Sequence, residues 1–120
     1  MLTDFSDVAK LLERRAQGGK PYLEFLRVAA MSAGLYVLPA GETDRQSPHR
    51  EDEMYYVIRG RARMRIASEE HDVREGCVIF VAAELEHRFV EVEEELVVLV
   101  FFAPAETELS KPRIGRNPTE

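Results

Sequence analysis

The chain has 120 residues and a formal net charge of −6. This length supports one domain with its own hydrophobic core and is too short for two ordinary domains. Apolar residues make up 45% of the sequence and charged residues 32%, which is the composition of a globular protein and excludes a disordered chain. The acidic charge argues against binding to nucleic acid or to anionic membranes.

The cysteine count and the chain ends predict a soluble, cytoplasmic protein. Cys77 is the only cysteine, so an intramolecular disulfide is excluded and a reducing compartment is expected. The N-terminal sequence MLTDFSDVAKLLERR is charged throughout and has no apolar signal-peptide core. The apolar run at residues 96–103 is far shorter than the ~20 residues that a membrane-spanning helix needs.

The predicted elements begin with one amphipathic helix at residues 4–15, capped by Asp4 or Ser6 and ended by Gly18 and Gly19. After Pro21 the pattern changes to short β-rich runs separated by turn residues. The predicted strands are residues 22–28, 33–38, 54–58 (ending at Gly60), 61–66, 78–81 and 96–102. This spacing indicates an all-β sandwich or barrel, with a helical segment at 1–19, the barrel domain at 20–105 and a C-terminal tail at 106–120.

Two histidines and a glutamate form the candidate metal site. His49 precedes Glu53 by four residues, and His87 follows a predicted strand across a short turn. Imidazole and carboxylate ligands together suit one first-row divalent metal ion such as Fe, Mn, Ni or Zn. In a straight strand His49 and Glu53 would stand ~13 Å apart, so the chain between them must turn if both bind one ion.

The spacing around these residues resembles the cupin family, whose motifs are G(X)5HXH(X)3–4E(X)6G and G(X)5PXG(X)2H(X)3N. His49, Glu53 and Gly60 match the second half of the first motif, and Gly76 and His87 match the spacing of the second. The resemblance implies an all-β double-stranded β-helix, or jelly-roll barrel, of the RmlC-like kind with a short N-terminal helix. It also implies a metal ion held by His49, Glu53 and His87.

The chain departs from these motifs at several positions. Ser47 replaces the first histidine of the HXH pair, so Ser47 or the amide of Gln46 is the candidate for a fourth metal position. In the second motif Ala82, Glu84 and Glu91 replace proline, glycine and asparagine.

Three protein ligands leave positions open for water, substrate or dioxygen, as catalytic metals require. The resemblance therefore implies a metal-dependent enzyme on a small polar substrate, with a dioxygenase favoured over an isomerase or lyase. A non-catalytic module that binds a small molecule or sugar, or a cupin that has lost its metal, are the alternatives. We also expect a homodimer that pairs through the strands at 22–28 and 96–102, which offer edges.

Other polar residues have plainer interpretations. Tyr55 shares a face with Glu53 and is the candidate catalytic proton donor, although it could equally fill the core. Phe89 shares the face of His87 and is expected to line the cavity around the metal site. Arg61, Arg63 and Arg65 could bind an anion, but alternation favours a solvated face for them, with Ala62, Met64 and Ile66 inside. Glu91 and residues 93–95 would oppose these arginines if the strands pair. His71 is expected in an exposed hairpin turn, and Cys77 is expected to be a small buried residue.

Overall fold

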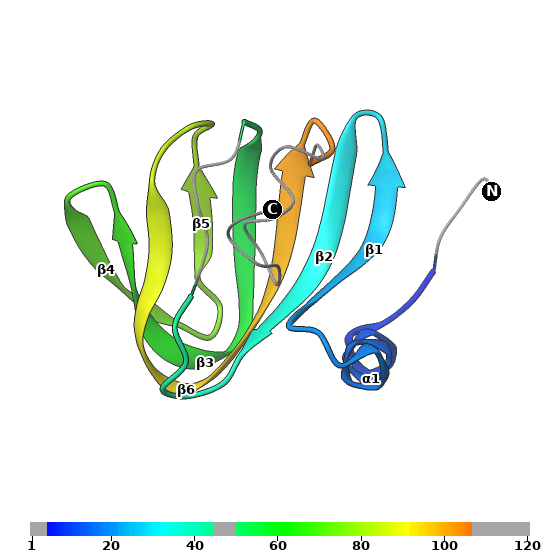
Figure 1. Ribbon diagram of the computed structural model, residues 1–120, viewed down its shortest axis with the longest axis horizontal. Coiled ribbons are helices and arrows are strands. Elements are labelled where there is room, and N and C mark those ends of the chain that lie inside the picture. Colours follow the sequence, from blue (N-terminus) through cyan, green and yellow to red (C-terminus); the bar gives the residue numbers. More distant parts are fainter. Residues whose placement is uncertain (1–4, 45–49, 107–120) are drawn as a thin grey trace.

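The computed structural model describes residues 5–44 and 50–106 (Figure 1). The order of elements is α1 (Val8–Gly18), β1 (Tyr22–Val28), β2 (Met31–Leu38), β3 (Asp52–Ile66), β4 (Glu69–Arg74), β5 (Val78–Val81) and β6 (His87–Ala103). Residues 107–120, which include most of the predicted C-terminal tail, and residues 45–49 lie outside the described residues. Within the described ranges, no helix is long and apolar enough to cross a membrane.

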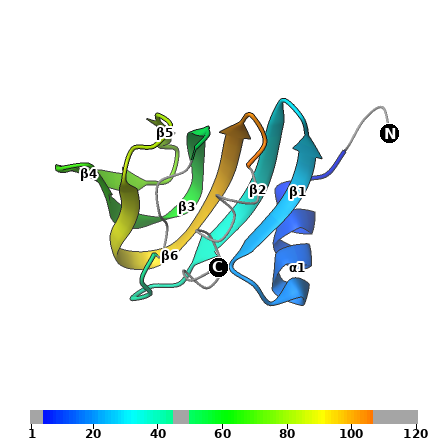
Figure 2. The same ribbon diagram turned by 45° about the horizontal axis from the view of Figure 1, so that its top comes forward.

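The strands form one antiparallel sheet in the order β1-β2-β6-β3-β4, and β5 pairs with β3 as an additional strand. Both β3 and β6 are long, at 15 and 17 residues, and they pair from Asp52 opposite Ala103 to Ile66 opposite His87. The first half of β3 also pairs with β5 and its second half with β4. The sheet therefore curls back on itself, as Figures 1 and 2 show, and the predicted double-stranded β-helix with a short N-terminal helix is confirmed.

Gly60 lies inside β3, so the prediction of two strands separated at this glycine is wrong. Its φ of 106° is accessible to glycine and strained for other residues. A Cβ atom at position 60 would collide with the backbone carbonyl of Glu95 on the neighbouring strand. The pairing of β3 with β6 shifts register around this point. Gly60 thus lets the strand bend against β6 and continue, where a turn was expected.

The inner face of the curled sheet holds the main core. The alternation predicted for the second half of β3 is confirmed for Ala62 and Met64, which are buried, while Ile66 is partly buried. The buried apolar residues of this cluster come from every strand except β1, with Tyr22 of β1 packed against it. They are Tyr36, Leu38, Tyr55, Val57, Ala62, Met64, Val73, Val81, Phe89, Val92, Leu96, Val98, Val100 and Phe102.

Helix α1 covers the outer face of the sheet beside β1 and β2 (Figure 2). Leu11 is buried there against Leu35, Val37 and Val97. The predicted helix start at residue 4 is wrong, because Asp7 is the N-cap and its carboxylate accepts a hydrogen bond of 2.8 Å from the Lys10 amide. The helix also runs past residue 15 to Gly18, and Gly19 ends it in the left-handed conformation.

The expected edge at residues 96–102 is wrong, because β6 lies in the middle of the sheet between β2 and β3. Leu96, Val97, Val98 and Val100 are all buried. Val97 faces α1, whereas Leu96, Val98 and Val100 face the inner core, so the strand is covered on both sides. The continuous apolar run reflects this double burial. The other expected edge, β1, pairs only with β2 and is confirmed.

Candidate functional site

Glu53 and His87 meet inside the curled sheet. Glu53 is the second residue of β3 and His87 is the first residue of β6. The Nε2 atom of His87 lies 2.8 Å from Oε1 of Glu53, and both side chains are 1% exposed. Burial of a charged carboxylate is costly unless a cation or hydrogen-bond donors compensate for the lost water. The Glu53 carboxylate therefore needs a compensating charge or hydrogen-bond donor, and His87 is the described residue beside it.

The two residues are far apart in strand register. Glu53 is opposite Phe102 of β6, whereas His87 is opposite Ile66 of β3. A straight β3 would separate positions 53 and 66 by ~40 Å. The side chains meet only because the sheet curls until its two ends face each other. The contact between Glu53 and His87 therefore depends on the curling of the sheet, because the two residues are not cross-strand partners.

A second contact fixes the orientation of the His87 ring. Its Nδ1 atom lies 2.8 Å from the backbone carbonyl oxygen of Leu85, so Nδ1 carries a proton and donates it. In a neutral imidazole Nε2 then presents a lone pair towards the Glu53 carboxylate. Burial lowers the pKa of His87, but the Glu53 carboxylate and the Leu85 carbonyl outweigh it and raise the pKa above 6.5. The contact therefore requires a positive charge, either a proton or a metal ion.

Tyr55 lies beside this pair in the core. It is fully buried, and its ring contacts His87 edge-on, with ring centroids 6.1 Å apart. The same ring also contacts Phe89, at a centroid distance of 5.1 Å. The structure thus places Tyr55 and Phe89 in the core next to His87, on the inner face that the alternation predicted. The role of Tyr55 as a proton donor stays a prediction.

Asp44 is an interior residue that the sequence analysis missed. It is fully buried, and its carboxylate accepts hydrogen bonds from the Tyr36 hydroxyl at 2.9 Å and from the Phe89 amide at 2.7 Å. Burial and the Asp44 carboxylate raise the pKa of Tyr36. Asp44 sits in a polar loop without periodicity, so no sequence signal marked it. Tyr36 could have been found, since it alternates onto the inner face of β2.

Tyr22 provides a second interior hydroxyl. Its ring lies over Gly34 in the space that a side chain at that position would occupy. It contacts the Tyr36 ring edge-on, at a centroid distance of 6.5 Å. The hydroxyl is buried and has no hydrogen-bond partner among the described residues. Burial raises the pKa of Tyr22, and so do the negative charges of Glu106, Glu24 and Glu53. Among the described residues, this hydroxyl is therefore a buried donor without an acceptor.

The comparison with protein families decides the identity of the fold. The sequence model described as "Cupin domain" matches residues 34–102, which include Asp44, Glu53 and His87. The chain belongs to the cupin family.

Other proteins resemble this cupin along most of its length. The uncharacterized protein SCO3923 of Streptomyces coelicolor is 47% identical over 95 residues, which are 79% of this chain and 90% of that protein. A solved RmlC-like cupin from Methanocaldococcus jannaschii, mj0764, has a TM-score of 0.67 at 19% identity and covers 87% of this chain and 93% of its own. The structure of the DMSP lyase DddQ from Ruegeria pomeroyi has a TM-score of 0.62 at 15% identity over 69% of this chain. This cupin spans about half of DddQ, 47% of its length, so that likeness concerns the fold alone.

The structure brings together two of the three predicted metal ligands. His49 lies outside the described residues, and so do Gln46 and Ser47, the candidates for a fourth position. Within residues 5–44 and 50–106, no group of three or more His, Cys, Asp or Glu side chains is arranged to hold a metal ion. Glu53 and His87 are thus the described part of the predicted site.

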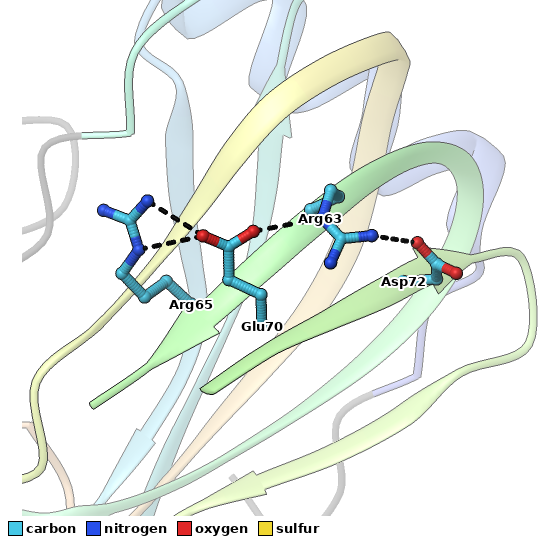
Figure 3. Close-up of polar contacts among 4 residues, drawn as sticks. All are labelled: Arg63, Arg65, Glu70 and Asp72. Carbon is cyan, nitrogen blue, oxygen red and sulfur yellow. Dashed lines mark hydrogen bonds and ion pairs between the residues drawn. The ribbon is translucent and has the colours of Figure 1, made fainter. Parts of the chain in front are cut away.

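The arginines of β3 form ion pairs on the outside of the barrel. Arg63 pairs with Glu70 and Asp72, and Arg65 pairs with Glu70 (Figure 3). Arg61 pairs with Glu93 and Glu94 of β6, at 2.8 Å and 3.4 Å, so the predicted opposition to the glutamates of β6 is confirmed for Arg61. Arg63 and Arg65 pair with carboxylates of β4 instead. Because all three arginines already pair with carboxylates, they are better explained as the solvent-exposed face of β3 than as a site for an anion.

Two other residues have no part in the interior site. His71 is exposed, as predicted, and its Nε2 atom lies 3.2 Å from Oε1 of Glu69. The expected hairpin turn around it is wrong, because Glu69–Arg74 pairs with β3 and forms β4. Cys77 is half-buried and packs against the inner core, consistent with a packing residue.

Proposed function

We propose that this cupin binds one divalent first-row metal ion through His49, Glu53 and His87 and uses the ion to bind a small polar molecule inside the barrel. The observation that carries this proposal is the buried contact of 2.8 Å between the Glu53 carboxylate and Nε2 of His87. Two of the three proposed ligands thus come from opposite ends of the sheet to one interior point.

The chemistry of this pair fits a metal ion. With metal–ligand bonds of ~2.0–2.1 Å, two donors at right angles around one ion stand ~2.9 Å apart. The Glu53–His87 separation of 2.8 Å has this size. The hydrogen bond from Nδ1 of His87 to the Leu85 carbonyl is of the kind that orients metal-binding histidines. The residues that the structure describes therefore support the proposal.

The remaining interior groups would bind and orient the ligand. When bound, the metal ion supplies Lewis acidity and, if it is iron, the capacity to activate dioxygen. The Tyr22 hydroxyl offers a hydrogen-bond donor to an oxygen of the ligand. Tyr55 and Phe89 provide apolar walls that exclude water around His87. We propose an oxygenase-like enzyme first and a non-catalytic small-molecule or sugar-binding cupin second, because these groups would serve either.

A cupin without metal is the third candidate, and one observation favours it specifically. The raised pKa of His87 beside Glu53 would also suit a buried imidazolium–carboxylate pair. The interior would then be stabilised by a proton in the position of the proposed ion.

Metal analysis of protein purified without a histidine tag tests the proposal. We expect about one equivalent of metal per chain after reconstitution with Fe, Mn, Ni or Zn in turn. Glu53→Gln and His87→Ala should each lower the metal affinity by about 100-fold or more. Loss of a residue that only hydrogen-bonds to a metal ligand already costs about 10- to 100-fold. His71→Ala is the matched control, since this histidine is exposed on β4. Equal metal content in the wild type and His87→Ala would contradict the proposal.

Turnover is tested separately. Oxygen consumption by the Fe(II)-loaded protein, measured with small acids, thiols and catechols, distinguishes an enzyme from a binding module. A metal-loaded protein that binds one of these molecules without consuming oxygen would favour the non-catalytic alternative.

A further inference from the structure

A cavity of about 320 Å³ lies between β4 and β5. Its most deeply buried lining residues are Met64 and Val73, which are almost completely shielded from water. Ile66, Cys77 and Ile79 also line it, and these three side chains pack against the inner core but are only partly buried. We call this space the β4–β5 cavity. Its walls are therefore inward-facing side chains that the rest of the barrel leaves incompletely covered.

The cavity exists because β4 and β5 pair with different halves of β3. Residues 53–56 of β3 pair with β5, and residues 61–66 pair with β4. Gly60 lies between these halves, where β3 bends and its register against β6 shifts. Among the described strands, β4 and β5 do not pair with each other, although they follow one another in the chain. Their inward-facing side chains thus leave a space between the two strands.

The β4–β5 cavity is distinct from the proposed metal site. Its described lining contains none of Glu53, Tyr55, His87 and Phe89. The two places are nevertheless neighbours on the inner face, because Ile66 is the cross-strand partner of His87. A molecule held by the lining of the cavity would therefore be a second ligand, beside whatever binds at the Glu53–His87 pair.

The lining offers little to a charged ligand. Asp72 already pairs with Arg63, and Nε2 of His71 lies 3.2 Å from Oε1 of Glu69. The Cys77 thiol accepts a hydrogen bond of 3.5 Å from a backbone amide. The other residues of the described lining have apolar side chains. A charged molecule would lose its water in this cavity without gaining a partner, so the lining favours a neutral, apolar one.

The size of the cavity suits a single ring. A closed apolar cavity of ~150 Å³ holds benzene, and ligand pockets in proteins begin at about 300 Å³. Water makes few hydrogen bonds to an apolar lining, so an apolar molecule displaces it easily. Such a molecule would also remove the exposed parts of Ile66 and Ile79 from water, which stabilises the complex. Val78 and Phe80 line the cavity from the exposed side of β5, so it is open to an entering ligand.

We infer that the β4–β5 cavity binds a small neutral apolar molecule, of the size of one aromatic or aliphatic ring with short substituents. The ligand is held by burial against Met64, Val73 and Ile79. No metal ion takes part, so the inference is independent of the proposed function.

Titration of the full chain with toluene tests the inference, with benzoate and benzylamine as charged molecules of similar size. One equivalent of toluene should bind with a dissociation constant below about 1 mM, and the charged molecules should bind at least ~10-fold more weakly. Cys77→Phe fills the cavity and should weaken toluene binding at least ~10-fold. Val28→Phe is the matched control and should leave it unchanged, because Val28 is exposed on β1.

Amide NMR shifts locate the bound toluene. We expect the largest shifts at Met64, Val73 and Ile79, which line the cavity. The same shifts and the same affinity should be found with and without a chelator, which separates this test from the metal analysis. Shifts confined to Glu53 and His87 would place toluene in the proposed metal site and would overturn the inference.

Three further outcomes would overturn it. A wild type that does not bind toluene up to the solubility limit has no site for this class of molecule. Toluene affinity that is the same in the wild type and in Cys77→Phe excludes the cavity as the site. Benzoate or benzylamine binding as tightly as toluene would contradict a neutral ligand. Circular dichroism verifies that each variant is folded, and Ile79→Phe replaces Cys77→Phe if the latter fails to fold.

Discussion

The ring of Tyr22 lies directly over Gly34 on the neighbouring strand β2, where any larger residue would have its side chain. The absence of a Cβ atom at position 34 therefore creates the space that holds a tyrosine inside the barrel. Gly34 itself is buried, in a strand whose other residues are almost all buried.

Gly34→Ala should destabilise the protein by about 1–3 kcal/mol, the usual cost of forcing extra atoms into a packed core. The added methyl group would overlap the Tyr22 ring and displace it. Urea denaturation measures the change in the free energy of unfolding. Gly18→Ala is the control, because a Cβ atom there meets nothing within 4 Å. An additional Tyr22→Leu substitution should recover part of the loss, and no recovery would show that the ring is not the obstacle.

Tyr22→Phe and Tyr36→Phe should have opposite effects on stability. The Tyr22 hydroxyl is buried and has no partner among the described residues, so its removal should be neutral or stabilising by up to about 1 kcal/mol. The Tyr36 hydroxyl donates to the buried Asp44 carboxylate, so its removal should cost about 1–3 kcal/mol. Both variants are compared with the wild type by denaturant unfolding. Equal losses would contradict the difference between the two hydroxyls.

The metal-free protein should lose stability as the pH rises above about 6.5. The folded-state pKa of His87 is raised above 6.5, the value expected in the unfolded chain. The stabilisation is therefore complete below that pH and is lost as the pH rises through the folded-state pKa. Unfolding in the presence of a chelator is measured across this range. His87→Gln should remove this part of the pH dependence, whereas His71→Gln should preserve it.

Glu70→Gln should have a small effect that depends on salt. Glu70 accepts hydrogen bonds from Arg65 and Arg63, and these contacts hold its pKa below the usual range (Figure 3). The three side chains lie on the solvent side, where water and ions screen the attraction. We expect a slight loss of stability at low ionic strength that disappears in concentrated salt. A large loss that persists in concentrated salt would mean that the cluster is more shielded from water than its position suggests.

The sequence predicted the fold and most strand positions because alternation in β3 and the apolar run in β6 are strong local signals. It could not show that β3 continues through Gly60, since a glycine within a strand pattern looks like a turn unless the crossing strand is known. The central position of β6 was missed for a related reason: burial on both faces depends on α1 and the core, which are distant in sequence.

The sequence predicted only those residues of the site that lie at the spacing of a cupin motif. Glu53 and His87 were identified from their spacing to glycines, and their contact follows from the curling of the sheet. Asp44 and Tyr22 had no such marker. Asp44 is polar in a polar loop, and the interior role of Tyr22 depends on the glycine across from it. Both positions are determined by tertiary packing.

Because β3 and β6 are both long, the distance between Glu53 and His87 depends on whether the whole barrel is folded. Since these residues occupy opposite ends of the β3–β6 ladder, any opening along that ladder separates them. A ligand that binds both Glu53 and His87 would therefore stabilise the folded state. Ligands of higher affinity should then raise the melting temperature of the protein further. A spectroscopic probe at the His87 imidazole would then report unfolding that begins as far away as the bend at Gly60.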